Sequence, residues 1–533
     1  MQSLNDQHVL ILGLGASGLA MARWCARCGA QVTVADTRVA PPQWATLQRD
    51  VPGARFVSGP FTASLIEDTQ VRAVLRSPGL TPTDIAPVSA AAIAQGIWAS
   101  GELGLFSQAL ADLKSTQGYS PQVLAITGTN GKTTVTALTG QLVSRAGKTV
   151  AVAGNIGPTL LDTLSAHLDA DTLPEVWVIE LSSFQLEGEK NFEPSVAAVL
   201  NITQDHLDWH GSMPAYTNAK ANVFGQQGLM VLNREDPLVM AMLSGAGTSQ
   251  GAKAPLGGSA AHEVASVGAK RAEPVRVKLQ RPVVRSHVTF GANMPQRPGD
   301  FGLEQVNGMV WLVRALEADE TRRKRGEAAE EIHIQRLMPA DALRIRGRHN
   351  AVNALAALAL ACAAGCALGP VLYGLREDRG EPHRVQSIGF FNDVEFFDDS
   401  KGTNVGATVA AQKGLGADRR LVVILGGEGK GQDFSPLAEP VSSHARAVVL
   451  IGRDAPRIRA ALEASGVALL DADSMAQAVV VAHAQAHAGD AVLMSPACAS
   501  FDMFDNYEHR ASVFCAAVHD MAAAAGVQME GVQ

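Results

Sequence analysis

The sequence predicts a three-domain α/β protein in which each domain is built on a mainly parallel sheet. The 533 residues are too many for a single hydrophobic core, and this length is typical of about three domains. Short apolar runs of strand length alternate with helical segments in each third of the chain, the pattern of strands joined by helical crossovers. Two early strands run directly into glycine-rich turns, at 13–18 and 128–131. We expect the domains to span 1–104, 105–380 and 381–533.

The first domain is predicted to be Rossmann-like, with strands at 8–13 and 31–35 and a helix between them. The turn into the helix reads GLGASG and Asp36 closes the second strand, which matches a fingerprint whose acid binds a ribose hydroxyl. Taken alone, this favours an NAD-dependent oxidoreductase. Two features weaken that interpretation: Thr37 and Arg38 offer donors to phosphate or pyrophosphate, and a second nucleotide loop follows. The glycines are also explained if they only pack the helix against the sheet.

The second domain is predicted to be P-loop ATPase-like because residues 122–134, QVLAITGTNGKTT, form an apolar strand, a glycine turn and a helix start. In such a loop, backbone N–H groups and the helix end face a triphosphate. Lys132 would reach the terminal phosphates, and Thr133 would offer its hydroxyl to Mg²⁺. The strict pattern is not met, since Ile126 replaces its first glycine. The alternative is an ordinary strand–turn–helix corner.

Polar side chains follow two further strands of this domain. Glu180 closes the strand at 176–180, where a Mg²⁺ ligand is expected beside a phosphate loop. The stretch NITQDHLDWH at 201–210 places acids and imidazoles in one strand-end loop, which suits metal and phosphate better than stability. Lys220 lies in a helical segment downstream, where it either binds phosphate, is modified, or is an ordinary surface lysine. For Glu180, the alternative is a solvent-exposed acid at the end of a strand. For the histidines at 201–210, the alternative is a structural role.

The third domain is also predicted to be Rossmann-like, with strands at 420–425, 445–451 and 491–495. Polar groups again follow apolar strands, in the stretches at 396–404, 426–430 and 495–502. Lysines and hydroxyls in such loops suit an anionic substrate, particularly a dicarboxylate. Each stretch alone could be a turn, but three in one domain indicate a cleft.

Composition excludes several classes of protein. The formal net charge of −8 argues against a nucleic-acid binder, and six cysteines in this length indicate no disulfide framework, so we expect a reducing cytoplasm. The polar N-terminus lacks a signal-peptide pattern, and the Ala-rich run at 354–372 is predicted to be a buried packing helix, so no membrane insertion is expected. The weakly periodic segment at 244–331 is predicted to be a surface elaboration with partial β structure and no site.

Taken together, these strings resemble the Mur ligase family of peptidoglycan synthesis. The resemblance covers nearly the whole chain and is carried by GLGASG, DTR, SPG, GTNGKTT, GNIG, ELSSFQLE, NITQDHLDWH, GRHNAVNALAA, DDSKGTN, GGEGKGQDF and SPACASFDMF. Sister ligases and folylpolyglutamate synthases share the ATP motifs. The DTR, DDSKGTN and SPACASFD strings are similar to those of the member that adds D-glutamate. The segment at 244–331 is longer than the family usually carries.

The resemblance implies a role for each matching residue. A UDP-linked substrate, rather than NAD, would be contacted by Ala16, Ser17, Thr37, Arg38, Gly79 and Asn155. ATP would be bound by Gly128, Thr129, Asn130, Gly131, Lys132, Thr133, Thr134, Asn350, Asn353, Arg384 and Asp399. Two Mg²⁺ ions would be held by Thr133, Glu180, His206 and Lys220, the last as a carbamate formed with CO₂. D-glutamate and the reacting acyl group would be surrounded by Lys401, Thr403, Lys430, Ser500, Phe501 and Tyr507.

The implied activity is an ATP-dependent amide ligation in the cytoplasm by a monomer. The carboxylate of UDP-N-acetylmuramoyl-L-alanine would attack the γ-phosphate of ATP, and the amine of D-glutamate would attack the resulting acyl phosphate. Lys132, Glu180, His206, Lys220 and Lys401 would be the catalytic residues. The residues alone leave open two other classes, the NAD-dependent oxidoreductase and a non-catalytic regulator that binds a UDP-sugar or nucleotide.

Overall fold

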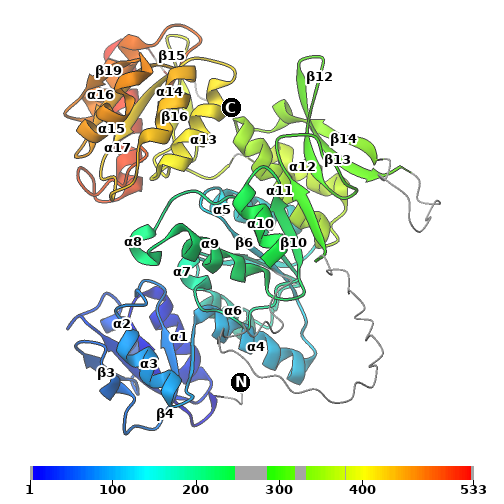
Figure 1. Cartoon of the computed structure of the whole chain (residues 1–533), viewed down its shortest axis with the longest axis vertical. Helices are drawn as coiled ribbons and strands as arrows, with labels where there is room; N and C mark the ends of the chain where they lie inside the picture. Colours follow the sequence, from blue (N-terminus) through cyan, green and yellow to red (C-terminus); the bar gives the residue numbers. More distant parts are fainter. Residues whose placement is uncertain (1–3, 246–284, 319–331, 379, 528, 530–533) are drawn as a thin grey trace, which may run out of the picture.

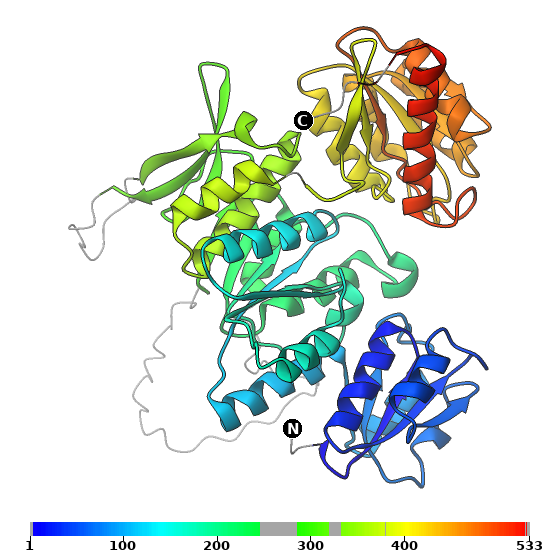
Figure 2. The same ribbon diagram turned by 180° about the vertical axis from the view of Figure 1, so that it is seen from behind.

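The computed structural model describes residues 4–245, 285–318, 332–378, 380–527 and 529. Three α/β bodies follow one another along its longest axis, from the N-terminal body through the central body to the C-terminal body (Figure 1). A smaller antiparallel sheet, β12–β14, projects sideways from the central body, and the view from behind shows the same arrangement (Figure 2). The predicted fold class, three α/β domains with mainly parallel sheets, is confirmed.

The N-terminal sheet is fully parallel, with the strand order β3-β2-β1-β4-β5. Its strands are β1 (His8–Leu12), β2 (Gln31–Asp36), β3 (Arg55–Ser58), β4 (Val71–Arg76) and β5 (Trp98–Gly101). The helical elements are α1 (Ala16–Arg27), α2 (Trp44–Asp50), η2 (Ala63–Leu65) and α3 (Ala86–Ala94). The strand order reverses direction between β1 and β4, so the loops after these strands form the crevice in which such sheets bind ligands.

The central sheet is also parallel, in the order β11-β10-β9-β6-β8-β7. Its strands are β6 (Gln122–Thr127), β7 (Val150–Gly154), β8 (Val176–Glu180), β9 (Val196–Val199), β10 (Leu229–Asn233) and β11 (His287–Phe290). The helices that surround it are α4 (Glu102–Gln117), α5 (Lys132–Arg145), α6 (Leu160–Asp169), α7 (Ser183–Leu186), α8 (Leu207–His210), α9 (Met213–Ala221), η3 (Asn222–Phe224), α10 (Pro237–Gly245), η4 (Ala340–Ala342), α11 (Arg348–Ala363) and α12 (Leu368–Glu377).

The smaller sheet consists of β12 (Phe301–Val306), β13 (Met309–Glu317) and β14 (Ile332–Pro339), paired antiparallel. The C-terminal sheet has the order β15-β16-β20-β17-β18-β19, in which only the β15–β16 pair is antiparallel. Its strands are β15 (Gln386–Phe391), β16 (Val394–Asp398), β17 (Leu421–Gly426), β18 (Ala445–Ile451), β19 (Ala468–Asp471) and β20 (Ala491–Met494). The helices are α13 (Val405–Gly416), η5 (Ser435–Leu437), α14 (Ala438–His444), α15 (Ala455–Leu462), η6 (Glu463–Ser465), α16 (Met475–Gln485) and α17 (Tyr507–Ala524).

Two sequence predictions need correction. The segment at 244–331 is not only a surface elaboration, because β11 joins the central sheet beside β10 and buries Phe290, which is 1% exposed. The β structure expected there is present in the part at 285–318, while 246–284 and 319–331 lie outside the described residues. The Ala-rich run at 354–372 forms parts of two helices, α11 and α12, since the chain leaves the first at Gly365 with a positive φ. The expected burial of α11 is confirmed.

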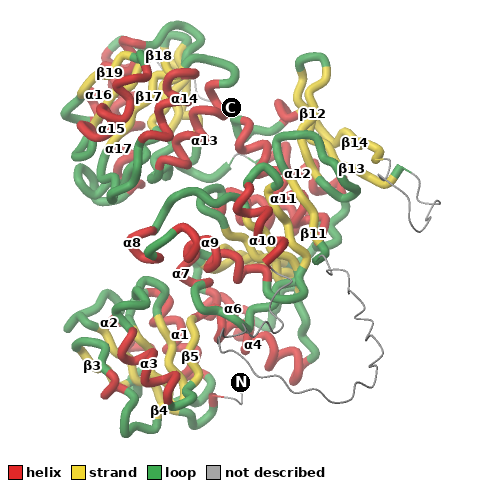
Figure 3. Tube along the Cα trace, viewed as in Figure 1, coloured by secondary structure: helices red, strands yellow, loops and turns green. Residues whose placement is uncertain are grey.

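Figure 3 shows α7, α8 and the loops beside them on the side of the central body that faces its two neighbours. This follows from the topology, because parallel strands all end at the same edge of their sheet. Within the described ranges, no helix is both long and apolar enough to cross a bilayer.

The glycine turn after β1 lets α1 approach the sheet closely. Gly18 lies in α1 at a point where an added Cβ would be 2.0 Å from the carbonyl oxygen of Gly13. No side chain fits there unless the helix moves away from β1. One of the glycines in this loop is therefore required by packing, whatever the loop binds.

We expect Gly18→Ala to destabilise the protein by about 1–3 kcal/mol, the usual cost of an overpacked site. Gly53→Ala is the matched control, because nothing lies within 4 Å of the Cβ it would add. Thermal and urea unfolding of both variants measure the difference. Equal stability of the two variants would contradict the close approach of α1 to β1.

Candidate active site

The ATP loop, defined as residues 128–131, joins β6 to α5. Gly128 and Gly131 have φ angles of 155° and 82°, in the region that favours glycine. The loop therefore turns sharply enough to point the first N–H groups of α5 outward, as an anion site requires. The half-buried Lys132 bends back over this loop, and its Nζ donates to the carbonyl oxygens of Gly128 at 2.9 Å and Thr129 at 2.8 Å. Burial lowers the pKa of Lys132, an effect that the nearby Glu180 opposes.

Glu180 ends β8, next to the ATP loop, and is 1% exposed. Its Oε1 accepts a hydrogen bond of 2.7 Å from the side-chain amide of Asn155. Its Oε2 is buried and has no hydrogen-bond partner among the described residues. A buried carboxylate oxygen without a donor is costly unless a cation or proton neutralises it. The residues present here therefore fit a divalent cation, and the hydroxyl of Thr133 at the start of α5 is a second oxygen ligand on the same loop.

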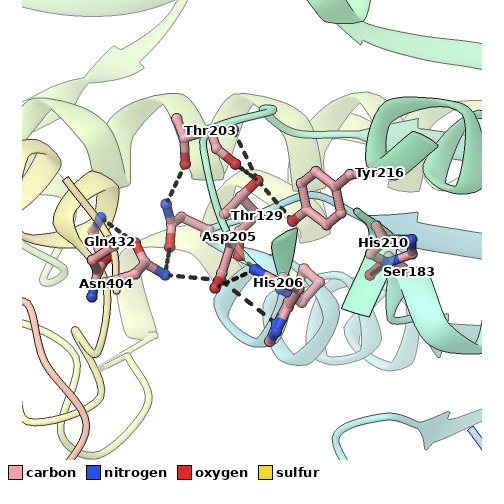
Figure 4. A network of polar contacts seen from close by, with 12 residues as sticks. Thr129, Ser183, Thr203, Asp205, His206, His210, Tyr216, Asn404 and Gln432 are labelled. Atoms are coloured by element: carbon pink, nitrogen blue, oxygen red, sulfur yellow. Dashed lines mark hydrogen bonds and ion pairs between the residues drawn. The ribbon is translucent and has the colours of Figure 1, made fainter. Parts of the chain in front are cut away.

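The acidic loop, defined as residues 201–208, follows β9 and leads into α8. His206 has a positive φ of 53°, and its Nε2 lies 3.6 Å from Asp205 Oδ2 (Figure 4). His210 has a different role, because its side chain is 1% exposed and its Nε2 lies 2.9 Å from the hydroxyl of Ser183. Burial is the main cause that lowers the pKa of His210 to about 4. His206 therefore faces the cavity, whereas His210 is a buried, neutral histidine.

Lys220 is 1% exposed on α9, beneath the ATP loop. Its Nζ donates to Gly128 O at 2.9 Å and to Thr127 Oγ1 at 3.3 Å. Burial, followed by repulsion from Lys132, lowers the pKa of Lys220 well below its ordinary value. Lys220 is therefore not an ordinary surface lysine, and that alternative from the sequence analysis is wrong.

The C-terminal domain contributes cations to the same region. Arg384, in the segment that enters this domain, donates from Nη2 to Thr133 Oγ1 at 3.0 Å. Burial lowers the pKa of Arg384, and its Nε is buried without a hydrogen-bond partner among the described residues. Lys401 lies with its Nζ 5.3 Å from the centroid of the Tyr507 ring. Arg384 and Lys401 therefore face the ATP loop from the C-terminal domain.

The two domains enclose a cavity of about 550 Å³. Its lining comes from the ATP loop, the ends of β7 and β8, the acidic loop and three loops of the C-terminal domain. The lining residues are Thr129, Asn130, Gly131, Lys132, Thr133, Asn155, Glu180, Gln204, Asp205, His206, Leu207, Asp208, Arg384, Lys401, Thr403, Asn404, Gly429, Lys430, Gly431 and Gln432. Most of the predicted ATP, metal and acyl-group residues are therefore brought together.

Some predicted residues lie outside this lining. Asn353 is next to the ATP loop, because a Cβ added at Gly131 would be 2.7 Å from its Oδ1, and Asn350 accepts from Asn353 at 3.2 Å. Asp399 is buried and accepts from Ser495 at 2.6 Å, and burial is the main cause that raises its pKa to about 7. The remaining predicted ATP, metal and D-glutamate residues outside the lining are Gly128, Thr134, Lys220, Ser500, Phe501 and Tyr507. Phe501 is 65% exposed.

Five of the six residues predicted to contact the UDP-linked substrate lie at the carboxyl edge of the N-terminal sheet, whereas the sixth, Asn155, follows β7 and lines the cavity. Ala16 and Ser17 begin α1, while the others follow β2 and β4, namely Thr37, Arg38 and Gly79. Asp36 is not available to a ribose, because its two oxygens accept from Leu14 N at 2.8 Å and from Arg38 Nε and Nη2 at 2.8 Å each. Burial would raise the pKa of Asp36, but these hydrogen bonds outweigh it and lower the pKa to about 2. The acid therefore shapes the loop, which removes the main argument for NAD.

Comparison with known proteins assigns the family. The MurD-like N-terminal domain of Mur ligases matches residues 7–101, the Mur ligase middle domain matches 126–273, and the Mur ligase glutamate ligase domain matches 383–498. The chain belongs to the Mur ligase family. The resemblance inferred from the sequence strings is thereby confirmed, and the protein is an enzyme of the ligase class rather than an oxidoreductase or a regulator.

Curated relatives of this Mur ligase match over its whole length. The UDP-N-acetylmuramoylalanine–D-glutamate ligase of Albidiferax ferrireducens is 73% identical, with 100% of this chain and 99% of the relative covered. The enzyme of the same name from Ralstonia nicotianae is 54% identical, with 99% of each chain covered. Among solved structures, a MurF ligase from Thermotoga maritima in complex with ADP has a TM-score of 0.53 at 14% identity, covering 97% of this chain and 96% of that one. This likeness shows the shared three-domain fold.

Three buried or cavity-lining residues of this Mur ligase, Asn404, Gln432 and Arg510, were not among the site residues predicted from the sequence. Asn404 and Gln432 line the cavity, and Arg510 is a fully buried arginine whose Nη2 and Nη1 donate to the carbonyl oxygens of Ser400 at 2.7 Å and Cys498 at 3.0 Å. The signal for the first two was present, since both lie in polar stretches that follow apolar strands. Nothing in the sequence marked Arg510.

We expect Lys132→Ala to lower kcat by on the order of 10²–10³, because the phosphates would lose a preorganised cation. Lys114→Ala, at an exposed position of α4, is the control for loss of one lysine. Measurement of ADP release and of the binding of a fluorescent ATP analogue tests both variants. Near-normal turnover of Lys132→Ala would refute the phosphate role.

Proposed function

We propose that this Mur ligase joins D-glutamate to UDP-N-acetylmuramoyl-L-alanine, with ATP converted to ADP and phosphate. The observation that carries the proposal is the shared cavity, where the ATP loop and Glu180 face Lys401 and Lys430 of the C-terminal domain. Full-length relatives at 73% and 54% identity carry the name of this activity. A cytoplasmic monomer suits the reaction, since ATP and a UDP-linked substrate are cytoplasmic and one chain supplies the whole cavity.

The reaction follows from the charges around the cavity. The alanyl carboxylate of the UDP-linked substrate attacks the γ-phosphorus of ATP; a P–O bond forms to the carboxylate and the bond to ADP breaks. Lys132 and Arg384 offset the charge on the transferred phosphoryl group. The amine of D-glutamate then attacks the acyl carbon, the C–O bond to phosphate breaks, and the amine loses a proton. Holding the reactants in line in this way can supply about 7–11 kcal/mol of the barrier reduction.

Residues of the C-terminal domain would position D-glutamate. Lys401, Thr403 and Lys430 offer two cations and a hydroxyl on the C-terminal wall of the cavity, a set that matches an amino acid with two carboxylates. Ser500, Phe501 and Tyr507 would complete this pocket on the side away from ATP. The UDP end of the other substrate would lie on Ala16, Ser17, Thr37, Arg38 and Gly79, with Asn155 contacting its sugar end.

Mg²⁺ fits the buried oxygens beside the ATP loop. Thr133 and Glu180 would hold one ion, and His206 and Lys220 as its carbamate would serve a second. When bound, the ions neutralise charge on the phosphates. Among the described residues, no three His, Cys, Asp or Glu side chains gather to hold a metal ion by themselves. Phosphate oxygens of ATP, water and the proposed carbamate on Lys220 would complete the ligand set.

Carbamylation of Lys220 agrees with its surroundings. The lowered pKa makes the neutral amine available, and only that form attacks CO₂. The nitrogen forms a bond to the carbon of CO₂ and releases one proton, which leaves a carboxylate at its end. The remaining N–H can still donate to Gly128 O, which the amine contacts now. The modification would exchange a buried amine, whose charged form Lys132 repels, for an anion that Lys132 attracts.

We expect ADP formation from UDP-N-acetylmuramoyl-L-alanine and ATP to require D-glutamate. L-glutamate, L-alanine and diaminopimelate, tested at equal concentration, should give no more than background. The measurement is coupled ADP release with mass analysis of the product. Turnover with another of these amino acids, and none with D-glutamate, would overturn the proposed substrate.

We expect Lys220→Ala to lose activity that added short carboxylic acids partly restore, because the free acid replaces the missing carbamate. Lys132→Ala is the matched control, since the same acids cannot replace a phosphate-binding cation. Initial rates with and without acetate or propionate measure the rescue. Full activity of Lys220→Ala without any acid would show that the carbamate is not needed.

A further inference from the structure

Asn404 lies where the C-terminal domain meets the two ligand-binding loops of the central domain (Figure 4). The side chain is buried, at 9% exposure. Its Oδ1 caps helix α13 by accepting from Ala407 N at 2.9 Å. Its Nδ2 donates to Asn130 Oδ1 at 3.1 Å and to Asp205 Oδ2 at 3.4 Å. One amide therefore serves a helix of one domain and two loops of another.

The two loops that Asn404 contacts are themselves tied together. Asn130 N donates to Asn201 Oδ1 at 2.8 Å, and Asn201 Nδ2 donates to Asn130 O at 3.0 Å. Thr203 N donates to Thr129 Oγ1 at 2.9 Å, and that hydroxyl also lies 3.0 Å from the hydroxyl of Tyr216. The ATP loop and the acidic loop thus form one hydrogen-bonded unit. The hydrogen bonds of Asn404 to Asn130 and Asp205 therefore depend on the positions of both loops.

Helix α13 is seated against the central domain at both ends. A Cβ added at Gly406 would lie 2.6 Å from Thr203 Oγ1 and 3.0 Å from Asn130 Nδ2. A Cβ added at Gly414 would lie 2.2 Å from Nδ1 of His349, on α11. The sequence thus provides glycine where the helix approaches the central domain most closely. The backbone of α13 therefore packs closely against the central domain at these two glycines.

The start of α13 is also connected to the loops expected to hold D-glutamate. Thr403 directly precedes Asn404 in the chain. Val405 N donates to Gln432 Oε1 at 3.0 Å, and Gln432 Nε2 donates to Ala497 O at 2.9 Å. Gln432 belongs to the loop of Lys430, and Ala497 belongs to the loop that leads to Ser500. These hydrogen bonds connect the three loops to the N-terminus of this helix.

We propose that Asn404 is a positioning residue that sets the D-glutamate loops of the C-terminal domain relative to the ATP loop and the acidic loop. The identity of the amino acid in this statement rests on the proposed function; the coupling of the loops does not. The amide is suited to the task because it carries one acceptor and one donor group, which diverge from the same carbon. Its acceptor stays on α13, and its donor reaches across the domain boundary.

The test is Asn404→Asp. An aspartate keeps the helix cap, because its carboxylate also accepts from Ala407 N and is favoured at a helix N-terminus. It replaces the donor by an oxygen that faces the oxygens of Asn130 and Asp205. The contact across the boundary becomes repulsive while the helix stays capped. Ser474→Asp is the matched control, because Ser474 caps α16 of the same domain by accepting from Gln477 N at 3.2 Å, and the variant adds the same charge.

We expect Asn404→Asp to lower kcat/KM for D-glutamate roughly tenfold or more, since a hydrogen bond to a charged group is replaced by repulsion. Its melting temperature should match that of Ser474→Asp, whose kinetics should be those of the unmodified chain. Small-angle X-ray scattering in the presence of ATP should show a larger radius of gyration for Asn404→Asp than for the control. Adding Asp205→Asn to Asn404→Asp exchanges donor and acceptor, and should return the radius of gyration toward that of the unmodified chain.

The scattering experiment separates this proposal from the proposed function, because it requires no turnover. If the unmodified chain does not use D-glutamate, the proposed function fails and the scattering alone decides on Asn404. An Asn404→Asp variant with an unchanged radius of gyration overturns the positioning role. So does an unchanged kcat/KM in a protein that does turn over D-glutamate.

Discussion

The active site depends on one backbone carbonyl that two lysines share. Gly128 O accepts from Lys132 Nζ and from Lys220 Nζ, both at 2.9 Å. Two ammonium groups this close, one of them fully buried, repel each other, and this repulsion is among the causes that lower the pKa of Lys220. ATP phosphates beside Lys132 and the proposed carbamate on Lys220 would both relieve the same repulsion.

The order of the strands explains why so many polar groups meet at this point. β6, β8 and β9 are neighbours in the central sheet, and they end in the ATP loop, in Glu180 and in the acidic loop, respectively. In the C-terminal sheet, β16, β20 and β17 are likewise neighbours, and the loops after them carry Lys401, Ser500 and Lys430. Two sheets with their carboxyl edges turned toward each other therefore produce one cavity from residues hundreds of positions apart.

This topology also decides what the sequence could predict. Lys132, Glu180, His206 and Lys401 all line the cavity, and the sequence singled them out because each lies at the end of an apolar strand or in the segment that follows one. His206 and His210 look alike in sequence, and only the left-handed conformation of the first and the burial of the second distinguish them. Asn404 gained its role from a contact between domains, which no local pattern encodes. The strand β11 was missed because it lies in a weakly periodic segment and is ordered by its pairing with β10.

The distribution of charge gives the C-terminal domain its part in the reaction. The central domain lines the cavity with Glu180, Asp205 and Asp208, whereas the C-terminal domain brings Arg384, Lys401 and Lys430. Opposite charges across the boundary attract, and Arg384 already reaches the hydroxyl of Thr133. A bound phosphate between the two sets gives these cations a stronger partner than a hydroxyl. Closure over ATP would then be favoured by the same charges that offset the transferred phosphoryl group, and it would exclude the water that hydrolyses an acyl phosphate.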